Sequence, residues 1–243
     1  MLSFTKVKAR AADRKGGKAI LQSLLPAAVS RDVLAAVPDD RVLAEMTRRI
    51  FCSGFAWSVI DKKWPGFEEA FLGFDPARLL MQPPEFWDRL VSDARIVRNG
   101  QKIMAVAANA RFVREVALRH GRFARFLAEW PSSDQVGLLG VLAKGGARLG
   151  GNTGMYFLRF IGWDGFMLSR DIVACLRDAG LDIADPPTSK RDLAKVQQQF
   201  NAWADETGLP YVHLSRICAL SIGENLPTER LRSHLDDAGD EAP

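Results

Sequence analysis

The stretch ARLGGNTGMYFLRFIGWDGFMLSRDIVACLRDAGL, residues Ala147–Leu181, decides the fold that we predict for this chain. The adjacent pair Gly150 and Gly151 marks a turn, and Thr153 starts an apolar helix behind it. A helix over Val136–Ala143 would place this turn between two helices. Glycine lets a backbone approach a ligand closely, and a helix start leaves N–H groups pointing outward. The turn is therefore predicted to suit a phosphate group.

The rest of the chain has helical periodicity in almost every segment, and alternation of period two is nearly absent. The longest predicted helix covers Lys102–His120, and a late apolar helix covers Tyr211–Ser221. A Pro–Gly pair predicts a turn at Trp64–Gly66. These patterns predict an all-α protein built from many short helices.

Composition is that of an ordinary globular protein, with 47% hydrophobic and 26% charged residues among 243. The 33 basic and 29 acidic residues give a net charge of +4, which permits a polyanionic partner without proving one. Neither a signal peptide nor a membrane-spanning run is recognisable. Cys52, Cys175 and Cys218 are scattered in apolar contexts, which indicates buried thiols in a reducing compartment. We expect a cytoplasmic protein.

The distribution of charged residues along the chain also predicts three parts. Residues 1–39 form a basic N-terminal segment, expected to be partly ordered, and residues 40–222 form the helical domain. Residues 223–243 form an acidic tail, expected to be mobile. The basic segment is either a solvated end or an arm that touches DNA.

The glycine turn is similar to the helix-hairpin-helix of DNA glycosylases of the endonuclease III superfamily. Leu149–Gly154 matches the second half of that hairpin, and Asp171 lies 18 residues after Thr153, where the family has an aspartate on a helix start. Arg148 departs from the pattern, because the family usually has glycine there. The resemblance implies a helix-hairpin-helix DNA glycosylase fold with two helical lobes around a cleft.

A second resemblance covers Arg48–Val113, which looks like bacterial 3-methyladenine DNA glycosylase I. It is carried by residues 53–57 (SGFAW), Lys62–Lys63, Phe67–Phe71, Phe74–Pro76, residues 90–99 (LVSDARIVRN), Lys102–Ile103 and Asn109–Arg111. From about 153 to 220 the chain is closer to bacterial glycosylase II. Two features depart from glycosylase I: no histidine stands at ligand spacing with a cysteine, so we expect no zinc, and Arg49 replaces a glutamate that contacts methylated adenine.

The resemblance implies hydrolysis of the N-glycosidic bond of alkylated purines, with 3-methyladenine as the expected base, in double-stranded DNA. Such an enzyme extrudes the nucleotide, holds the base in an aromatic slot and places a carboxylate beside the sugar, where positive charge develops. Asp171 is the candidate carboxylate, with Asp164 as the alternative. Trp57, Phe55, Tyr156 and Trp163 are candidates for base binding, and Gly150, Gly151, Thr153, Lys144 and Arg148, with Arg159 nearby, for the DNA backbone.

Each candidate also has a plain structural interpretation. Asp171 stands where acidic residues normally favour a helix start, and Asp164 lies in a turn. Trp57 and the other aromatic residues are equally typical of a packed core. A double glycine between helices is often only a turn, and surface cations are often only solvated.

Asn152 stands just before Thr153, where glycosylases that also nick the strand have a lysine nucleophile. Asparagine cannot form a Schiff base, so we expect a monofunctional enzyme without lyase activity. No cysteine quartet for an iron–sulfur cluster follows the hairpin, and we expect no cofactor and no metal. The remaining expectations are a monomer and no membrane partner. The alternative function is a catalytically inactive DNA-binding protein on the same fold, which Arg49 and the altered hairpin favour.

Overall fold

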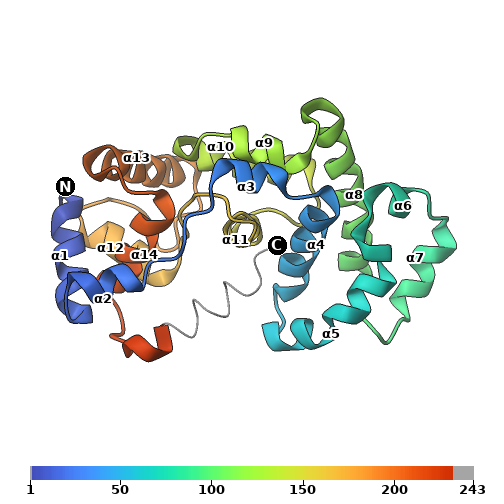
Figure 1. The fold of residues 1–243 in the computed structure, drawn as a ribbon, viewed down its shortest axis with the longest axis horizontal. Coiled ribbons are helices and arrows are strands. Elements are labelled where there is room, and N and C mark those ends of the chain that lie inside the picture. Colours follow the sequence, from blue (N-terminus) through green and yellow to red (C-terminus); the bar gives the residue numbers. More distant parts are fainter. Residues whose placement is uncertain (1, 232–243) are drawn as a thin grey trace. The chain divides into compact units, whose positions relative to one another are not determined.

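The structure, a computed structural model, describes residues 2–231, and over this range it consists of helices joined by turns and loops (Figure 1). The predicted all-α class is confirmed for these residues. Most of the predicted acidic tail, residues 232–243, lies outside the described residues. Among the helices described, none is both long and apolar enough to cross a membrane.

The described chain divides into two compact units. The first unit comprises residues 2–29, 131–136 and 158–231. Its elements are α1 (Phe4–Lys15), α2 (Lys18–Ser23), the 3-10 turn η2 (Ser132–Asp134), α12 (Arg170–Asp178), α13 (Lys190–Thr207) and α14 (Tyr211–Ser221).

Helix α1 packs against α14, although the two lie at opposite ends of the described chain (Figure 1). Phe4, Val7 and Ala11 are fully buried on its inner face, and the Phe4 ring lies 5.1 Å from that of Trp203. The start of the basic segment is therefore part of a core. The cations of α1 hold the unit together: Arg10 binds Asp178 at 2.5 Å, Arg14 donates to the carbonyl oxygens of Leu220 and Gly223, and Lys15 donates to Asn225 Oδ1.

The second unit comprises Ser30–Trp130 and Gly137–Phe157. Helices α10 and α11 contribute residues to both units. The elements are α3 (Arg31–Ala36), α4 (Asp39–Cys52), α5 (Trp57–Ala70), η1 (Leu72–Phe74), α6 (Pro76–Leu80), α7 (Pro84–Val91), α8 (Gly100–His120), α9 (Phe123–Glu129), α10 (Gln135–Gly145) and α11 (Asn152–Phe160).

Helix α8 is the centre of the second unit and packs against α4, α6, α7 and α9. It is the helix predicted at Lys102–His120, and it starts two residues earlier, where the Asn99 side chain accepts from Lys102 N at 3.1 Å. Its buried face includes Ile103, Val106 and Val113. A second layer of aromatic side chains packs beyond α4; its fully buried members are Phe51, Phe67, Phe71 and Phe74.

The turn predicted at Trp64–Gly66 is wrong, because α5 continues through Pro65. The Trp64 ring stacks on those of Phe67 and Phe74, and its Nε1 donates to Glu68 Oε1 at 3.0 Å. These contacts stabilise the helical backbone and offset the hydrogen bond that proline removes. Tertiary packing thus overrides the local turn signal of the Pro–Gly pair.

Candidate functional site

The glycine turn joins α10 to α11, so the two helices predicted to flank it are confirmed. Gly154, in the first turn of α11, allows the closest contact: a Cβ there would lie 2.4 Å from the Leu149 carbonyl oxygen and 3.1 Å from Leu139 Cδ2. Backbone bonding into α11 starts with Met155 N–H donating to the Gly151 carbonyl oxygen at 3.3 Å. The preceding N–H groups at this helix start are available for an acceptor such as a phosphate oxygen.

The side chain of Asn109 fixes the start of this turn. It is fully buried on α8, accepts from Ala147 N at 2.7 Å and donates to the Ala147 carbonyl oxygen at 3.1 Å. One amide therefore satisfies both backbone groups of a loop residue, as a neighbouring strand would. Asn109 belongs to the stretch that carries the glycosylase I resemblance.

Arg148 has a backbone φ of +60°, and Gly151 has a φ of +57°. This left-handed region costs a residue with a Cβ about 1–2 kcal/mol, whereas glycine enters it freely. The sequence pattern predicts glycine at position 148, and the backbone does adopt a glycine-type conformation there. The exposed Arg148 side chain donates to Gln101 Oε1, and Lys144 on α10 is exposed as well.

Trp57 and Tyr156 form the second candidate feature of this unit. Their rings meet edge to face, with centroids 5.4 Å apart and planes at 81°. Both residues are partly open to solvent, with 40% of Trp57 and 38% of Tyr156 exposed. The guanidinium carbon of Arg49 lies 4.8 Å from the centre of the Trp57 ring, and Arg49 Nε is 2.6 Å from Glu45 Oε1. We call Glu45, Arg49, Trp57 and Tyr156 the Trp57 cluster.

Phe55 lies beside a different cation. The Lys102 ammonium is 4.8 Å from the Phe55 ring centre, and it donates to the carbonyl oxygens of Phe51 at 3.2 Å and Ser53 at 2.5 Å. Lys102 thus caps the C-terminal end of α4. Burial lowers the pKa of Lys102, and the nearby charge of Arg148 lowers it further.

Glu45 and Lys102 are not among the site residues predicted from sequence. The signal for Glu45 is its spacing from Arg49, since residues four apart on a helix face each other. Lys102 has no comparable signal, because the carbonyl groups that it contacts are distant in sequence.

In the first unit, Asp171 is half-buried in the first turn of α12. Gly223, with a φ of +76°, approaches it so closely that a Cβ there would lie 2.4 Å from Asp171 Oδ1. Asp164, the alternative carboxylate, accepts from Val212 N at 2.9 Å and so caps the start of α14. Asp164 therefore has a structural role in capping this helix.

Of two further candidates in the first unit, Trp163 is buried and Arg159 is half-buried. Trp163 is only 4% exposed, and its ring closely approaches Gly165, which is typical of a packing residue. Burial lowers the pKa of Arg159 to about 10, with the nearby charge of Arg216 acting in the same direction and Asp164 opposing it.

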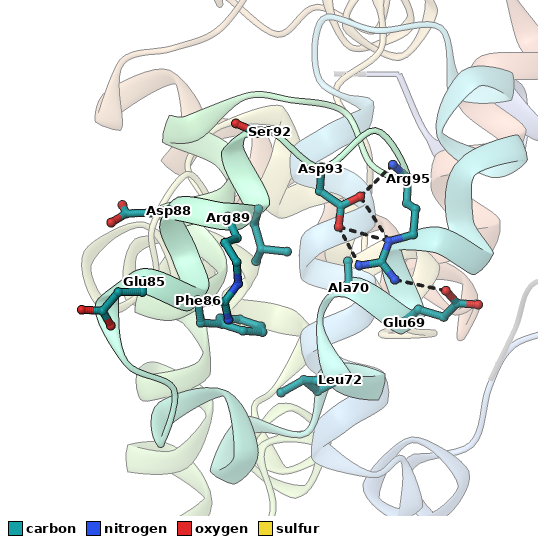
Figure 2. Close-up of a pocket in the computed structure, with 11 residues that line it drawn as sticks. Glu69, Ala70, Leu72, Glu85, Phe86, Asp88, Arg89, Ser92, Asp93 and Arg95 are labelled. Carbon is teal, nitrogen blue, oxygen red and sulfur yellow. Dashed lines mark hydrogen bonds and ion pairs between the residues drawn. The ribbon is translucent and has the colours of Figure 1, made fainter.

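A groove in the second unit contains none of the predicted site residues. It has a volume of about 780 Å³ and lies along α5 and α7 (Figure 2). Arg95 pairs there with Asp93 at 2.7 Å and Glu69 at 3.3 Å, and this arginine holds the pKa of Asp93 below its usual value. The acidic residues Glu69, Glu85, Asp88 and Asp93 outnumber the basic residues Arg89 and Arg95 in its lining. The groove is therefore poorly suited to a DNA backbone. Within residues 2–231, no three or more His, Cys, Asp or Glu side chains are grouped to hold a metal ion.

Comparisons with known proteins relate the second unit to one family. Residues 35–137 match the Methyladenine glycosylase family. Over 59 residues the chain is 37% identical to DNA-3-methyladenine glycosylase 1 of Escherichia coli K12, covering 24% of this chain and 32% of that protein. The predicted resemblance to glycosylase I is thereby confirmed. The chain spans about a third of the length of this curated relative.

Two solved structures of 3-methyladenine DNA glycosylase I from Staphylococcus aureus are also similar. One, described as the structural basis of 3-methyladenine recognition, has 23% identity and a TM-score of 0.46, covering 51% of this chain and 77% of that chain. The other, a mutant form of the enzyme, has 20% identity and a TM-score of 0.45, covering 63% of this chain and 85% of that chain.

Proposed function

We propose that this protein is a monofunctional DNA glycosylase that removes alkylated purines, with 3-methyladenine as the main substrate. The observation that carries the proposal is the Trp57 cluster, a partly open aromatic site whose members Glu45, Arg49 and Trp57 lie in the segment that matches the Methyladenine glycosylase family. The curated relative is named for 3-methyladenine, and an electron-rich aromatic face suits a positively charged base.

In this mechanism the hairpin holds the DNA backbone. The N–H groups that start α11, together with Lys144 and Arg148, would bind phosphate oxygens. The close approach at Gly154 and the two bonds from Asn109 support the rigid loop that such binding requires.

The flipped base would stack within the Trp57 cluster, with Phe55 nearby. Asp171 would then act at the sugar, where its negative charge stabilises the oxocarbenium-like transition state and orients the attacking water. A purine nucleotide alkylated at N3 or N7 already carries positive charge and its base leaves as a neutral molecule, so the protein has little need of a general acid. Asn152 lacks the amine for a Schiff base, and water is therefore the nucleophile.

The test is release of free 3-methyladenine from methylated duplex DNA by the wild type, Asp171→Asn and Asp164→Asn, measured by chromatography. We expect Asp171→Asn to lower release by about 100-fold or more while DNA binding persists. Asp164→Asn is the matched control, because its amide oxygen can still cap α14. A borohydride trapping assay should give no covalent adduct.

Equal release by the wild type and Asp171→Asn would remove Asp171 from the mechanism. No release by the wild type, with salt-sensitive DNA binding intact, would support the inactive DNA-binding protein instead. A covalent adduct would contradict the monofunctional assignment.

A further inference from the structure

The face of Trp57 already has an occupant. The Arg49 guanidinium is a planar, delocalised cation whose central carbon lies 4.8 Å from the indole centre, and its side chain is only 2% exposed. Trp57 itself remains 40% exposed. A desolvated cation over a tryptophan ring makes one of the stronger cation–π contacts, and a guanidinium is flat enough to stack there.

A carboxylate completes the binding of this cation. Glu45 lies one turn before Arg49 on α4, with Oε1 2.6 Å from Arg49 Nε and only 14% of its side chain exposed. Tyr156 meets the edge of the same indole at 81°. An aromatic face, a buried carboxylate and an aromatic wall are together the features that bind a flat organic cation.

We propose that Arg49 is a resident cation in the base-binding slot, and that a positively charged alkylated purine displaces it to stack on Trp57 and pair with Glu45. This inference rests on the proposed function, and it assigns base recognition to Glu45. The alkylated purine resembles the guanidinium in the relevant respects, since both are planar and carry a delocalised positive charge with N–H donors at the edge.

The exchange favours damaged bases over normal ones. A neutral base that displaced Arg49 would take a cation away from the buried Glu45 carboxylate, and removing one partner of a buried ion pair is strongly destabilising. A cationic base replaces one positive charge with another, so the pairing of Glu45 is kept. Displacement of Arg49 therefore costs more free energy for a neutral base than for a cationic one. This difference matters because the normal bases, which are neutral, greatly outnumber lesions in DNA.

The experiment measures binding of two small probes by calorimetry, without DNA and without turnover. 3,9-Dimethyladeninium keeps the charge of the damaged nucleoside, and 9-methyladenine is its neutral counterpart. The proteins are the full-length wild type, Arg49→Ala and the double variant Arg49→Ala/Glu45→Gln. Arg49→Ala should bind the cation about tenfold or more tightly than the wild type, because no resident cation has to be displaced. The double variant should lose this increase in affinity for the cation. The affinity for the neutral probe should differ little between the wild type and Arg49→Ala.

The opposite result overturns the inference. If Arg49→Ala binds the cation no better than the wild type, Arg49 supports the tryptophan from behind and does not occupy the slot. If Arg49→Ala increases the affinity for the neutral probe as much as for the cation, the slot does not select for positive charge and Glu45 has no role in recognition.

Folding of Arg49→Ala is checked by thermal melting, which also gives a second readout. The cationic probe, and methylguanidinium ion, should raise the melting temperature of Arg49→Ala more than that of the wild type, because in the wild type either cation must first displace Arg49. Arg49→Gln provides a second variant, since it removes the positive charge and keeps a polar side chain at this position. A melting temperature of either variant that neither cation changes contradicts the proposal.

These outcomes are independent of the proposed activity. If the wild type releases 3-methyladenine but Arg49→Ala does not bind the cationic probe more tightly, the resident-cation proposal is rejected and the glycosylase proposal stands. If Arg49→Ala binds the cationic probe more tightly but no base is released from DNA, the resident-cation proposal stands and the glycosylase proposal is rejected.

Discussion

Substitution of Asn109 by alanine should destabilise the hairpin more than any change to its exposed contacts. The substitution removes two hydrogen bonds, at 2.7 and 3.1 Å, and leaves both backbone groups of Ala147 without the partner that Asn109 supplied. A buried polar group that loses its partner costs about 1–3 kcal/mol. Ala147 is half-buried, so water replaces part of what is lost. We expect a total loss of about 2–3 kcal/mol.

The assay is thermal and urea unfolding of the full chain. For a protein of this size, such a loss lowers the melting temperature by about 6–9 °C. The matched control is Gln101→Ala, which removes the exposed contact of the same loop with Arg148 and should change stability by less than about 0.5 kcal/mol. Hydrogen exchange at the Ala147 amide should become much faster in Asn109→Ala and stay slow in Gln101→Ala.

Asn109→Asp separates the donor from the acceptor. The carboxylate still accepts from Ala147 N–H but faces the Ala147 carbonyl oxygen without a proton to donate, so this variant should be at least as unstable at neutral pH and recover on acidification. A melting temperature of Asn109→Ala within about 2 °C of the wild type would refute the reasoning, since the two bonds would then contribute nothing net.

Three further predictions follow from single contacts. Gly154→Ala should destabilise the protein by about 1–3 kcal/mol in urea unfolding, because the new methyl group would meet the Leu149 carbonyl oxygen at 2.4 Å; a neutral result would mean that α11 shifts freely. Arg148→Gly should raise the melting temperature by a few degrees at most, since its φ of +60° suits glycine, yet weaken salt-dependent DNA binding; unchanged DNA binding would place Arg148 outside the interface. Burial raises the pKa of the Cys52 thiol from 9.0 to about 11, so its contribution to stability is complete below pH 9 and is lost as the pH rises towards 11. Unfolding in urea at about pH 8 and about pH 10.5 should therefore show a smaller decline for Cys52→Ala than for the wild type, and equal declines would reject this linkage.

Local signals in the sequence predict much of the fold. Ser30 caps α3 through its side chain, and Asp75 accepts from Ala77 N and Arg78 N at the start of α6, as expected of such residues before a helix. Helix α14 spans Tyr211–Ser221, the range predicted from its apolar pattern. The thiols of all three cysteines are free and buried, as predicted. Each of these features depends on residues that are close together in the chain.

The features that the sequence does not reveal depend on distant partners. Helix α1 has the composition of a solvated basic arm, and its packing on α14 and α13, both distant in sequence, explains why Phe4 and Val7 are buried. The Trp57 cluster joins residues from α4, α5 and α11, so the position of Arg49 over the indole cannot be derived from the residues around it. The roles of Asp171 and of the hairpin at DNA stay predictions.

The pairing of α1 with α14 has a consequence for synthesis on the ribosome. Helix α1 is synthesised before α14, and the face that carries Phe4, Val7 and Ala11 has this packing partner about two hundred residues later. Most of the second unit emerges in between as one continuous stretch, Ser30–Trp130. Domains generally fold as they emerge, and contacts distant in sequence form late. We therefore expect the first unit to complete its packing only after Ser221 has been synthesised, and the apolar side of α1 to stay exposed on the nascent chain until then.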